Sequence, residues 1–132
     1  MYIDIMKEDS NDISILVIEK SDDYIFSYNI LFNLFLPSYE MFYVKTFSEL
    51  QRKISNNSHF CIAICEIFIL GANWEDILHN IKGKVDNIIF TSAYDRKFPP
   101  VKNLINKGYS YMEKPFEIDE LKEMVDLKLS NN

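Results

Sequence analysis

Apolar residues along this chain fall into five short runs, and the segments between the runs repeat their apolar residues with a helical period. The runs cover residues 13–18, 41–45, 60–71, 87–90 and 109–112. The run at 60–71 is the longest and is almost wholly apolar, which predicts a strand buried on both faces. Strands of this kind belong to parallel sheets that helices cover on both sides.

The segments between the runs carry signals for the beginning and end of helices. Their spacing predicts helices over 24–36, 48–54, 73–81, 99–107 and 118–129. Pro37 ends the first helix, and a Ser48-x-x-Gln51 capping box opens the second after strand 41–45. Asn73 caps the third helix, and Gly108 ends the fourth. A turn at Asn56-Asn57-Ser58 is expected before the longest apolar run.

Strands and helices therefore alternate five times, without an internal repeat, a low-complexity segment or a linker. Strict alternation with right-handed crossovers predicts an α/β fold, a doubly wound five-stranded parallel sheet with five helices in a three-layer sandwich. A chain of 132 residues has room for one such domain. We expect a polar N-terminal extension at 1–12, the domain at 13–129 and a tail at 130–132.

The charge balance narrows the classes of partner. A formal net charge of −6, without a local cluster of basic residues, argues against a surface that binds nucleic-acid phosphates. No apolar run is long enough to cross a bilayer, and the acidic start of the sequence is unlike a signal peptide. We therefore expect a cytoplasmic protein whose partner is neither a nucleic acid nor a membrane.

The two cysteines lie four residues apart on one expected strand. At about 3.3 Å per residue their Cα atoms are roughly 13 Å apart, which is beyond the reach of a disulfide. Cys61 and Cys65 are therefore expected to be buried free thiols. His59 and His79 show no metal-ligand spacing relative to these cysteines and are expected at the surface or in helix caps.

One carboxylate interrupts the longest apolar run. Glu66 lies where the run gives way to a loop, and burial of an acid is costly unless the acid is paired. Ligands of parallel α/β sheets bind beyond the carboxyl ends of the strands. Glu66 therefore marks the candidate functional site, and a satisfied acid at a strand end is the structural alternative.

Polar residues stand at the ends of the expected strands, within motifs that occur together in one protein family. The motifs are Ile-Leu-Val-Ile ending at Glu19, Glu66 with Gly71 five residues later, Ile-Ile-Phe-Thr-Ser-Ala with its Ser92, and Lys114-Pro115-Phe116 with Tyr111 three residues before the lysine and a Glu-Ile-Asp-Glu-Leu helix start after it. This set, spread over 13–129, resembles the receiver domain of bacterial two-component response regulators, the CheY-like family.

The resemblance implies a flavodoxin-like (CheY-like) fold with a site at the carboxyl end of the sheet. In that family two acids and a phosphoacceptor Asp hold Mg²⁺, and a Ser/Thr and a Lys grip the phosphoryl group. By motif, the acid pair falls on Glu19 and Lys20, and the acceptor falls on Glu66. The hydroxyl falls on Ser92, and the lysine falls on Lys114.

The resemblance also implies a conformational switch and a partner surface. Tyr111 falls on the switch aromatic of the family, and Pro115 follows a cis peptide bond there. Ser92 and Lys114 complete the set of switch or interaction residues. The implied partner is a histidine kinase or an output protein that contacts residues 99–129. A turn serine and a core tyrosine are the structural alternatives for positions 92 and 111.

Two positions depart from the family pattern, and both departures weaken metal binding. Glu66 is one methylene longer than Asp, which moves the carboxylate by about an ångström. Lys20 stands at a metal-ligand position, and an ammonium has no lone pair for a cation. Glu19 and Glu66 then oppose Lys20 and Lys114 with no net charge. We expect Lys20 in place of Mg²⁺; a residual metal site would use Glu19, Glu66 and the backbone carbonyl of Phe68.

These departures favour a non-enzymatic, receiver-like signalling domain that acts by protein–protein contact, without a cofactor and without Mg²⁺-dependent aspartyl phosphorylation. The alternative is a working phospho-receiver that takes a phosphoryl group from a histidine kinase with Mg²⁺ as cofactor. A flavin-binding, flavodoxin-like protein is the remote alternative, because no phosphate-cradling loop follows the first strand. For Lys20, a solvated loop position is the structural alternative to metal replacement.

Overall fold

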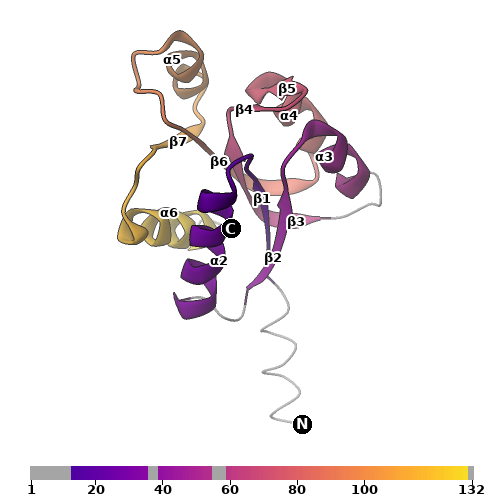
Figure 1. Ribbon diagram of the computed structural model, residues 1–132. Helices are drawn as coiled ribbons and strands as arrows, with labels where there is room; N and C mark the ends of the chain where they lie inside the picture. The colour runs from indigo at the N-terminus through magenta and orange to yellow at the C-terminus, as the bar shows by residue number, and fades with distance from the viewer. Residues whose placement is uncertain (1–12, 36–38, 55–58, 131–132) are drawn as a thin grey trace.

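The structure, a computed structural model, describes residues 13–35, 39–54 and 59–130. The expected extension at 1–12, the helix stop at Pro37, the turn at 56–58 and residues 131–132 lie outside this part of the chain. Five parallel strands form the central sheet in the order β2-β1-β3-β6-β7 (Figure 1). Their bounds are β1 (Ser14–Ile18), β2 (Glu40–Val44), β3 (Phe60–Glu66), β6 (Val85–Ser92) and β7 (Ser110–Glu113). The predicted parallel sheet is confirmed.

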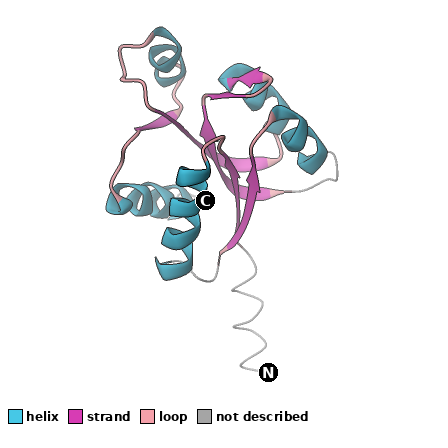
Figure 2. Cartoon of the chain, viewed as in Figure 1, coloured by secondary structure: helices cyan, strands magenta, loops and turns pink. Residues whose placement is uncertain are grey.

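Five helices cover the two faces of this sheet within the described residues (Figure 2). They are α2 (Asp22–Phe35), α3 (Phe47–Ile54), α4 (Trp74–Ile81), α5 (Pro99–Asn106) and α6 (Ile118–Ser130). Helices α2 and α6 pack on one face, and α3, α4 and α5 pack on the other. The predicted three-layer sandwich is confirmed.

Strand β1 illustrates why the central strands are apolar at every position. Its side chains alternate between the two faces, as strand geometry requires. Ile15 and Val17 belong to the core under α2 and α6, whereas Leu16 and Ile18 belong to the core under α3, α4 and α5. All four side chains are fully buried. Burial on both faces therefore removes the polar alternation of a surface sheet.

The capping residue of α3 differs from the prediction. The helix begins at Phe47, and the backbone N–H of Glu49 donates to Thr46 Oγ1 at 3.2 Å. The cap is therefore Thr46, with Glu49 as the acidic residue three positions later, and the predicted Ser48-x-x-Gln51 box is wrong. The pairs Thr46/Glu49 and Ser48/Gln51 have the same hydroxyl and carboxylate or amide chemistry and are offset by two residues. Only the backbone conformation distinguishes them.

The apolar run at 60–71 is not one strand. Strand β3 ends at Glu66, and the rest of the run forms a small antiparallel hairpin of β4 (Phe68–Ile69) and β5 (Ala72–Asn73). Gly71 sits in its turn with a φ of 95°, a conformation that side chains disfavour. The hairpin is tied to the start of α3, because the backbone N–H of Phe47 donates to the carbonyl of Leu70 at 3.0 Å.

Two smaller predictions are also confirmed. Asn73 caps α4 in a capping box with Asp76, and the peptide bond before Pro115 is cis. The cysteines form no disulfide, and Cys65 is buried as predicted, whereas Cys61 is only half-buried. Among the described helices, none combines the length and apolar composition that crossing a bilayer requires.

Candidate functional site

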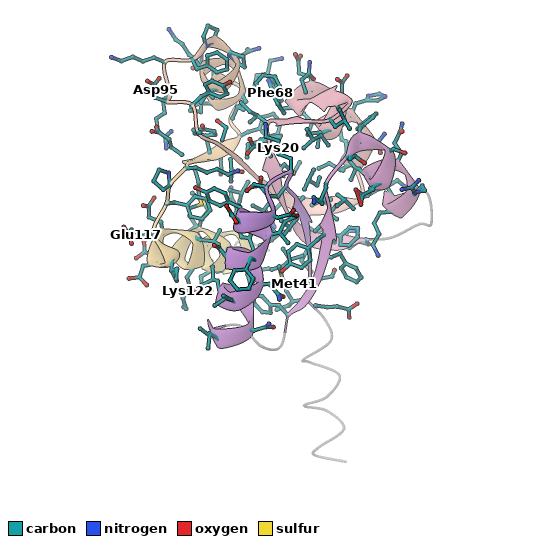
Figure 3. The ribbon with its side chains drawn as sticks, in the orientation of Figure 1. Lys20, Met41, Phe68, Asp95, Glu117 and Lys122 are labelled. Atoms are coloured by element: carbon teal, nitrogen blue, oxygen red, sulfur yellow. The ribbon has the colours of Figure 1, made fainter. Side chains whose placement is uncertain are left out.

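The topology brings the polar strand ends of the chain to one edge of the sheet. Parallel strands all finish at the same edge, and the register pairs Ile18 at the end of β1 with Val44 on one side and Cys65 on the other. Glu19 follows β1 directly, Glu66 is the last residue of β3, and Lys114 follows β7. Figure 3 shows Lys20 at this end of the sheet, far from Met41 at the other end.

Lys114 lies between the two buried acids. Its Nζ is 2.6 Å from Glu19 Oε1 and 2.8 Å from Glu66 Oε2. The contact with Glu66 has hydrogen-bond geometry, whereas the contact with Glu19 is an ion pair without it. The lysine side chain is only 7% exposed, and its ammonium also lies 4.2 Å from the centre of the Tyr24 ring. A single ammonium therefore contacts both carboxylates from within the protein.

Lys20 contacts the same acid from the solvent side. Its Nζ is 3.7 Å from Glu66 Oε1, and its side chain is 55% exposed. The structure thus places both Lys20 and Lys114 on Glu66, but not equally. Exposed ion pairs at this distance contribute little to stability, about 0.2–1 kcal/mol. We name Glu19, Glu66, Lys20 and Lys114 the charged cluster.

The environment of Glu66 is set by burial and by its partners. Burial raises the pKa of the Glu66 carboxyl, and the neighbouring Glu19 charge adds to this effect. The hydrogen bond and charge of Lys114, and then the charge of Lys20, oppose the rise in pKa. Thr91 Oγ1 donates a longer hydrogen bond of 3.5 Å to Glu66 Oε2. The acid is therefore buried but not isolated.

The charged cluster does not fit a divalent metal ion. Two carboxylates face two ammonium groups, so the formal charges cancel without a cation. Glu19 Oε1 and Glu66 Oε2 both contact the ammonium of Lys114. Across the described ranges, no three His, Cys, Asp or Glu side chains gather closely enough to share a metal ion. Mg²⁺ in proteins is usually held by one or two carboxylates together with water, and both carboxylates of this cluster already contact ammonium groups.

Ser92 and Tyr111 form a second, uncharged group beside the charged cluster. Ser92 Oγ and Tyr111 Oη are hydrogen-bonded to each other, and the backbone N–H of Tyr94 donates to Ser92 Oγ at 3.1 Å. Tyr111 Oη also donates to the carbonyl of Tyr94. We name Ser92, Tyr94 and Tyr111 the hydroxyl network. Burial raises the pKa of the Tyr111 phenol, and its hydrogen bond with Ser92 opposes the rise.

Arg96 contacts the outer side of the hydroxyl network. Its guanidinium donates to the backbone carbonyl of Tyr111 at 3.3 Å and lies 5.7 Å from the centre of that ring. Strand β7 is an edge strand, so the carbonyl of Tyr111 faces away from the sheet. An exposed side chain therefore covers part of this edge.

Four residues of the site were not predicted from the sequence. Thr91 points to the opposite face of β6 from Ser92, which is how one residue contacts Glu66 and the other contacts Tyr111. Tyr24 and Tyr28 lie four residues apart on the inner face of α2. Burial and the Glu19 charge raise the pKa of Tyr28. Strand alternation and helix spacing carry the signal for these three, but nothing in the sequence marks Arg96.

Comparison with known proteins agrees with this arrangement at the level of the fold. No protein-family model and no curated protein matches the sequence. Among solved structures, the chain is similar to the signal receiver domain of a putative LuxO repressor protein from Vibrio parahaemolyticus. The TM-score is 0.74 with 24% identity over 89% of this chain and 90% of that one. The chain has the fold of a signal receiver domain.

Other receiver structures are similar at lower identity. The receiver domain of the sensor histidine kinase PA1611 from Pseudomonas aeruginosa PAO1, which holds a magnesium ion in its active site cleft, matches with a TM-score of 0.73 and 15% identity. The match covers 89% of this chain and 97% of that domain. Full-length FixJ from B. japonicum matches at 0.74 and 18% identity, over 91% of this chain but only 59% of FixJ. The expected flavodoxin-like (CheY-like) fold is therefore confirmed.

Proposed function

We propose that this chain is a receiver domain of two-component signalling that works by contact with a partner protein, without Mg²⁺-dependent aspartyl phosphorylation and without enzymatic activity. The observation that carries the proposal is the position of the Lys114 ammonium between Glu19 and Glu66. A phosphoacceptor site needs a surplus of negative charge to hold the metal ion. Here that surplus is absent, because Lys20 and Lys114 balance both acids.

The state of Ser92 supports the same proposal. Its hydroxyl is fully buried and already bonded to Tyr111 and to the backbone of Tyr94. To grip a phosphoryl group, Ser92 would have to break the contact with Tyr111. The hydroxyl network is therefore already hydrogen-bonded without any ligand.

The proposed contact surface covers residues 99–129, beside the hydroxyl network. A groove of about 500 Å³ runs there between β7 and α6, and it is lined by Arg96, Tyr111, Glu120, Met124 and Leu127, among others. Methionines and a leucine lie in this groove beside charged side chains, which suits an adaptable contact of mixed polarity. A histidine kinase and an output protein are the two classes of partner that this proposal includes.

A titration followed by backbone NMR tests the proposal. Mg²⁺ is added to the protein, followed by beryllium fluoride or acetyl phosphate, and the amide shifts around Glu66 and Ser92 are monitored. We expect no saturable shift in the wild type. The matched control is the double variant Lys20→Asp, Glu66→Asp, which restores an acid pair and an Asp acceptor and is expected to bind Mg²⁺.

The opposite result has a clear meaning. Saturable, Mg²⁺-dependent shifts at both positions in the wild type would favour the working phospho-receiver, with Glu66 as an acceptor of phosphoryl groups from a histidine kinase. If the double variant also fails to bind Mg²⁺, the cause lies in the surrounding geometry rather than in Lys20.

A further inference from the structure

Helix α2 exposes an apolar stripe on its outer face. Phe26, Ile30 and Leu34 are 66%, 41% and 69% exposed, and their spacing of four residues places them on one side of the helix. Tyr28 and Phe32, on the inner side, are buried. Figure 1 shows α2 on the outside of the molecule, beside α6. The outer face of a surface helix is usually charged or polar, so this stripe is a candidate interface.

The same segment lacks charge. Residues 24–39 contain no charged side chain, although the whole chain has 14 basic and 20 acidic residues. A net charge of −6 makes two copies of the chain repel each other in general. This repulsion is weakest where two uncharged faces meet. The charge pattern therefore favours contact between copies at α2 over contact at the charged surfaces.

A cavity lies next to the stripe on the same side of the molecule. It has a volume of about 380 Å³ and lies between α2 and the start of α6. Its lining is mainly apolar and includes Tyr24, Leu31, Phe116 and Ile118, with Asp23 and Ser27 as the polar residues on the α2 side. The rings of Tyr24 and Phe116 are 6.0 Å apart, so the wall is an aromatic pair in contact. The cavity is large enough for an apolar side chain.

The stripe and the cavity are complementary under a two-fold rotation. If the axis passes near Ile30, two α2 helices run antiparallel, and position 34 of one lies level with positions 26–27 of the other. Leu34 then faces the cavity beside Ser27 of the other copy, and the two Ile30 side chains meet at the axis. A projection and a hole on the same face are what a self-complementary contact requires. We infer that the chain forms a homodimer through α2, with Leu34 inserted in the cavity of the second copy.

The exposed area suits a weak dimer. At roughly 200 Å² per fully exposed large side chain, the exposed fractions of Phe26, Ile30 and Leu34 amount to about 350 Å² per copy. The two copies together offer about 700 Å² from these residues, and Ile118, which is 48% exposed, adds to this area, so the interface stays below the roughly 1,200 Å² of stable complexes. The dimer therefore forms in a concentration-dependent manner. This inference does not depend on the proposed function, because the charged cluster takes no part in it.

Analytical ultracentrifugation of the full chain tests the inference. The weight-average mass is expected to rise from 15.6 kDa towards twice that value with increasing concentration. Leu34→Glu places an unpaired charge in the apolar cavity, and we expect it to weaken dimerisation about 100-fold or more. Leu70→Glu is the matched control, because Leu70 is 76% exposed in the β4–β5 turn, away from α2. Circular dichroism checks that both variants are folded, and Leu34→Ala gives a milder second test.

Cross-linking tests the two-fold axis. In a Cys61→Ser background, Ile30→Cys is expected to form a symmetric disulfide on oxidation. Phe26→Cys alone is not, because antiparallel helices separate the two copies of position 26 by about 12 Å. A mass that stays at 15.6 kDa at every concentration overturns the inference and assigns the stripe to a different partner. Dimerisation of a folded Leu34→Glu variant with wild-type affinity, or cross-linking at position 26 but not at 30, also overturns it.

Discussion

The charged cluster and the hydroxyl network lie at the same edge of the sheet, and each has buried residues at its centre and one exposed residue, but they are held together in different ways. The charged cluster depends on ion pairs, with one buried ammonium between Glu19 and Glu66. The hydroxyl network depends on neutral hydrogen bonds among Ser92, Tyr111 and the backbone of Tyr94. The first cannot lose Lys114 without leaving buried carboxylates without their shared ammonium. The second can lose a hydroxyl, because a neutral hydrogen bond contributes only about 0.5–1.5 kcal/mol.

This difference separates a fixed part of the site from an adjustable one. The buried members of the charged cluster, Glu19, Glu66 and Lys114, form the fixed part, because removing one partner of a buried ion pair is costly. The hydroxyl network is the adjustable part. It lies next to the proposed contact surface, and the exposed Arg96 covers its outer side. Rearrangement of this edge on binding a partner is therefore expected at Tyr111 rather than at Glu66.

Removal of Lys114 is the strongest test of this contrast. Lys114→Met keeps the apolar stem but leaves Glu19 and Glu66 buried without their shared ammonium. Breaking a buried ion pair in this way costs about 3–5 kcal/mol, so the free energy of unfolding is expected to fall by that amount. Urea denaturation at neutral pH measures it. Lys102→Met, at an exposed position of α5, is the control, and equal effects of the two substitutions would contradict the role given to Lys114.

Removal of the tyrosine hydroxyl is expected to have a smaller effect. Tyr111→Phe deletes the hydrogen bonds to Ser92 and Tyr94 but leaves no charge unpaired. The expected loss of unfolding free energy is about 1–2 kcal/mol, measured by the same denaturation experiment. Tyr94→Phe, whose ring stacks on Phe98 at the surface, is the control. A loss as large as that of Lys114→Met would remove the distinction between the two groups.

Truncation of Lys20 is expected to change stability least of the three. Lys20→Ala removes an exposed ammonium 3.7 Å from Glu66, and the expected loss is below about 1 kcal/mol. Added salt screens an exposed pair, so the difference from the wild type is expected to shrink in high salt. Lys97→Ala, in an exposed loop, is the comparison. A salt-independent loss of several kcal/mol would place Lys20 inside the fixed part of the site.

The pH dependence of stability gives the finest test. Burial raises the pKa of Glu66 in the folded protein, although Lys114 opposes the rise. The folded state therefore holds this proton more tightly than the unfolded chain, and this group lowers the free energy of unfolding as pH rises through the folded pKa.

Glu66→Gln removes this contribution. The free energy of unfolding of the variant, relative to the wild type, is therefore expected to increase as the pH rises from the ordinary pKa of a Glu carboxyl, about 4.3, through the higher pKa of the folded Glu66. Denaturation of both proteins across this range measures the difference. A relative stability that falls with pH would show that the pairing with Lys114 outweighs burial.

The sheet was predictable because burial on both faces leaves a strong apolar signal. All five strands lie where the apolar runs predicted them, to within a few residues. The hairpin at 68–73 was missed because its residues are as apolar as those of β3, and composition does not reveal a reversal of direction. The cap of α3 was misplaced because Thr46 and Ser48 offer the same hydroxyl chemistry.

The site was only partly predictable. Motifs located Glu19, Glu66 and Lys114 at the strand ends, and the structure brings these three together. The unequal contacts of Lys20 and Lys114 with Glu66 depend on side-chain conformation, which sequence spacing does not determine. Arg96 reaches Tyr111 from a loop, and its role follows only from the three-dimensional path of that loop.

The shared ammonium of Lys114 also restricts the evolutionary routes open to this domain. Lys20→Asp alone would set three carboxylates against one lysine, while the acceptor position would still carry the longer side chain of Glu66. Glu66→Asp alone would withdraw its carboxylate by about an ångström from an ammonium that now serves two acids. Each single step therefore weakens a pairing before the next step can replace it. Neither single substitution is therefore favourable alone, and a metal-binding site at this position requires both substitutions together.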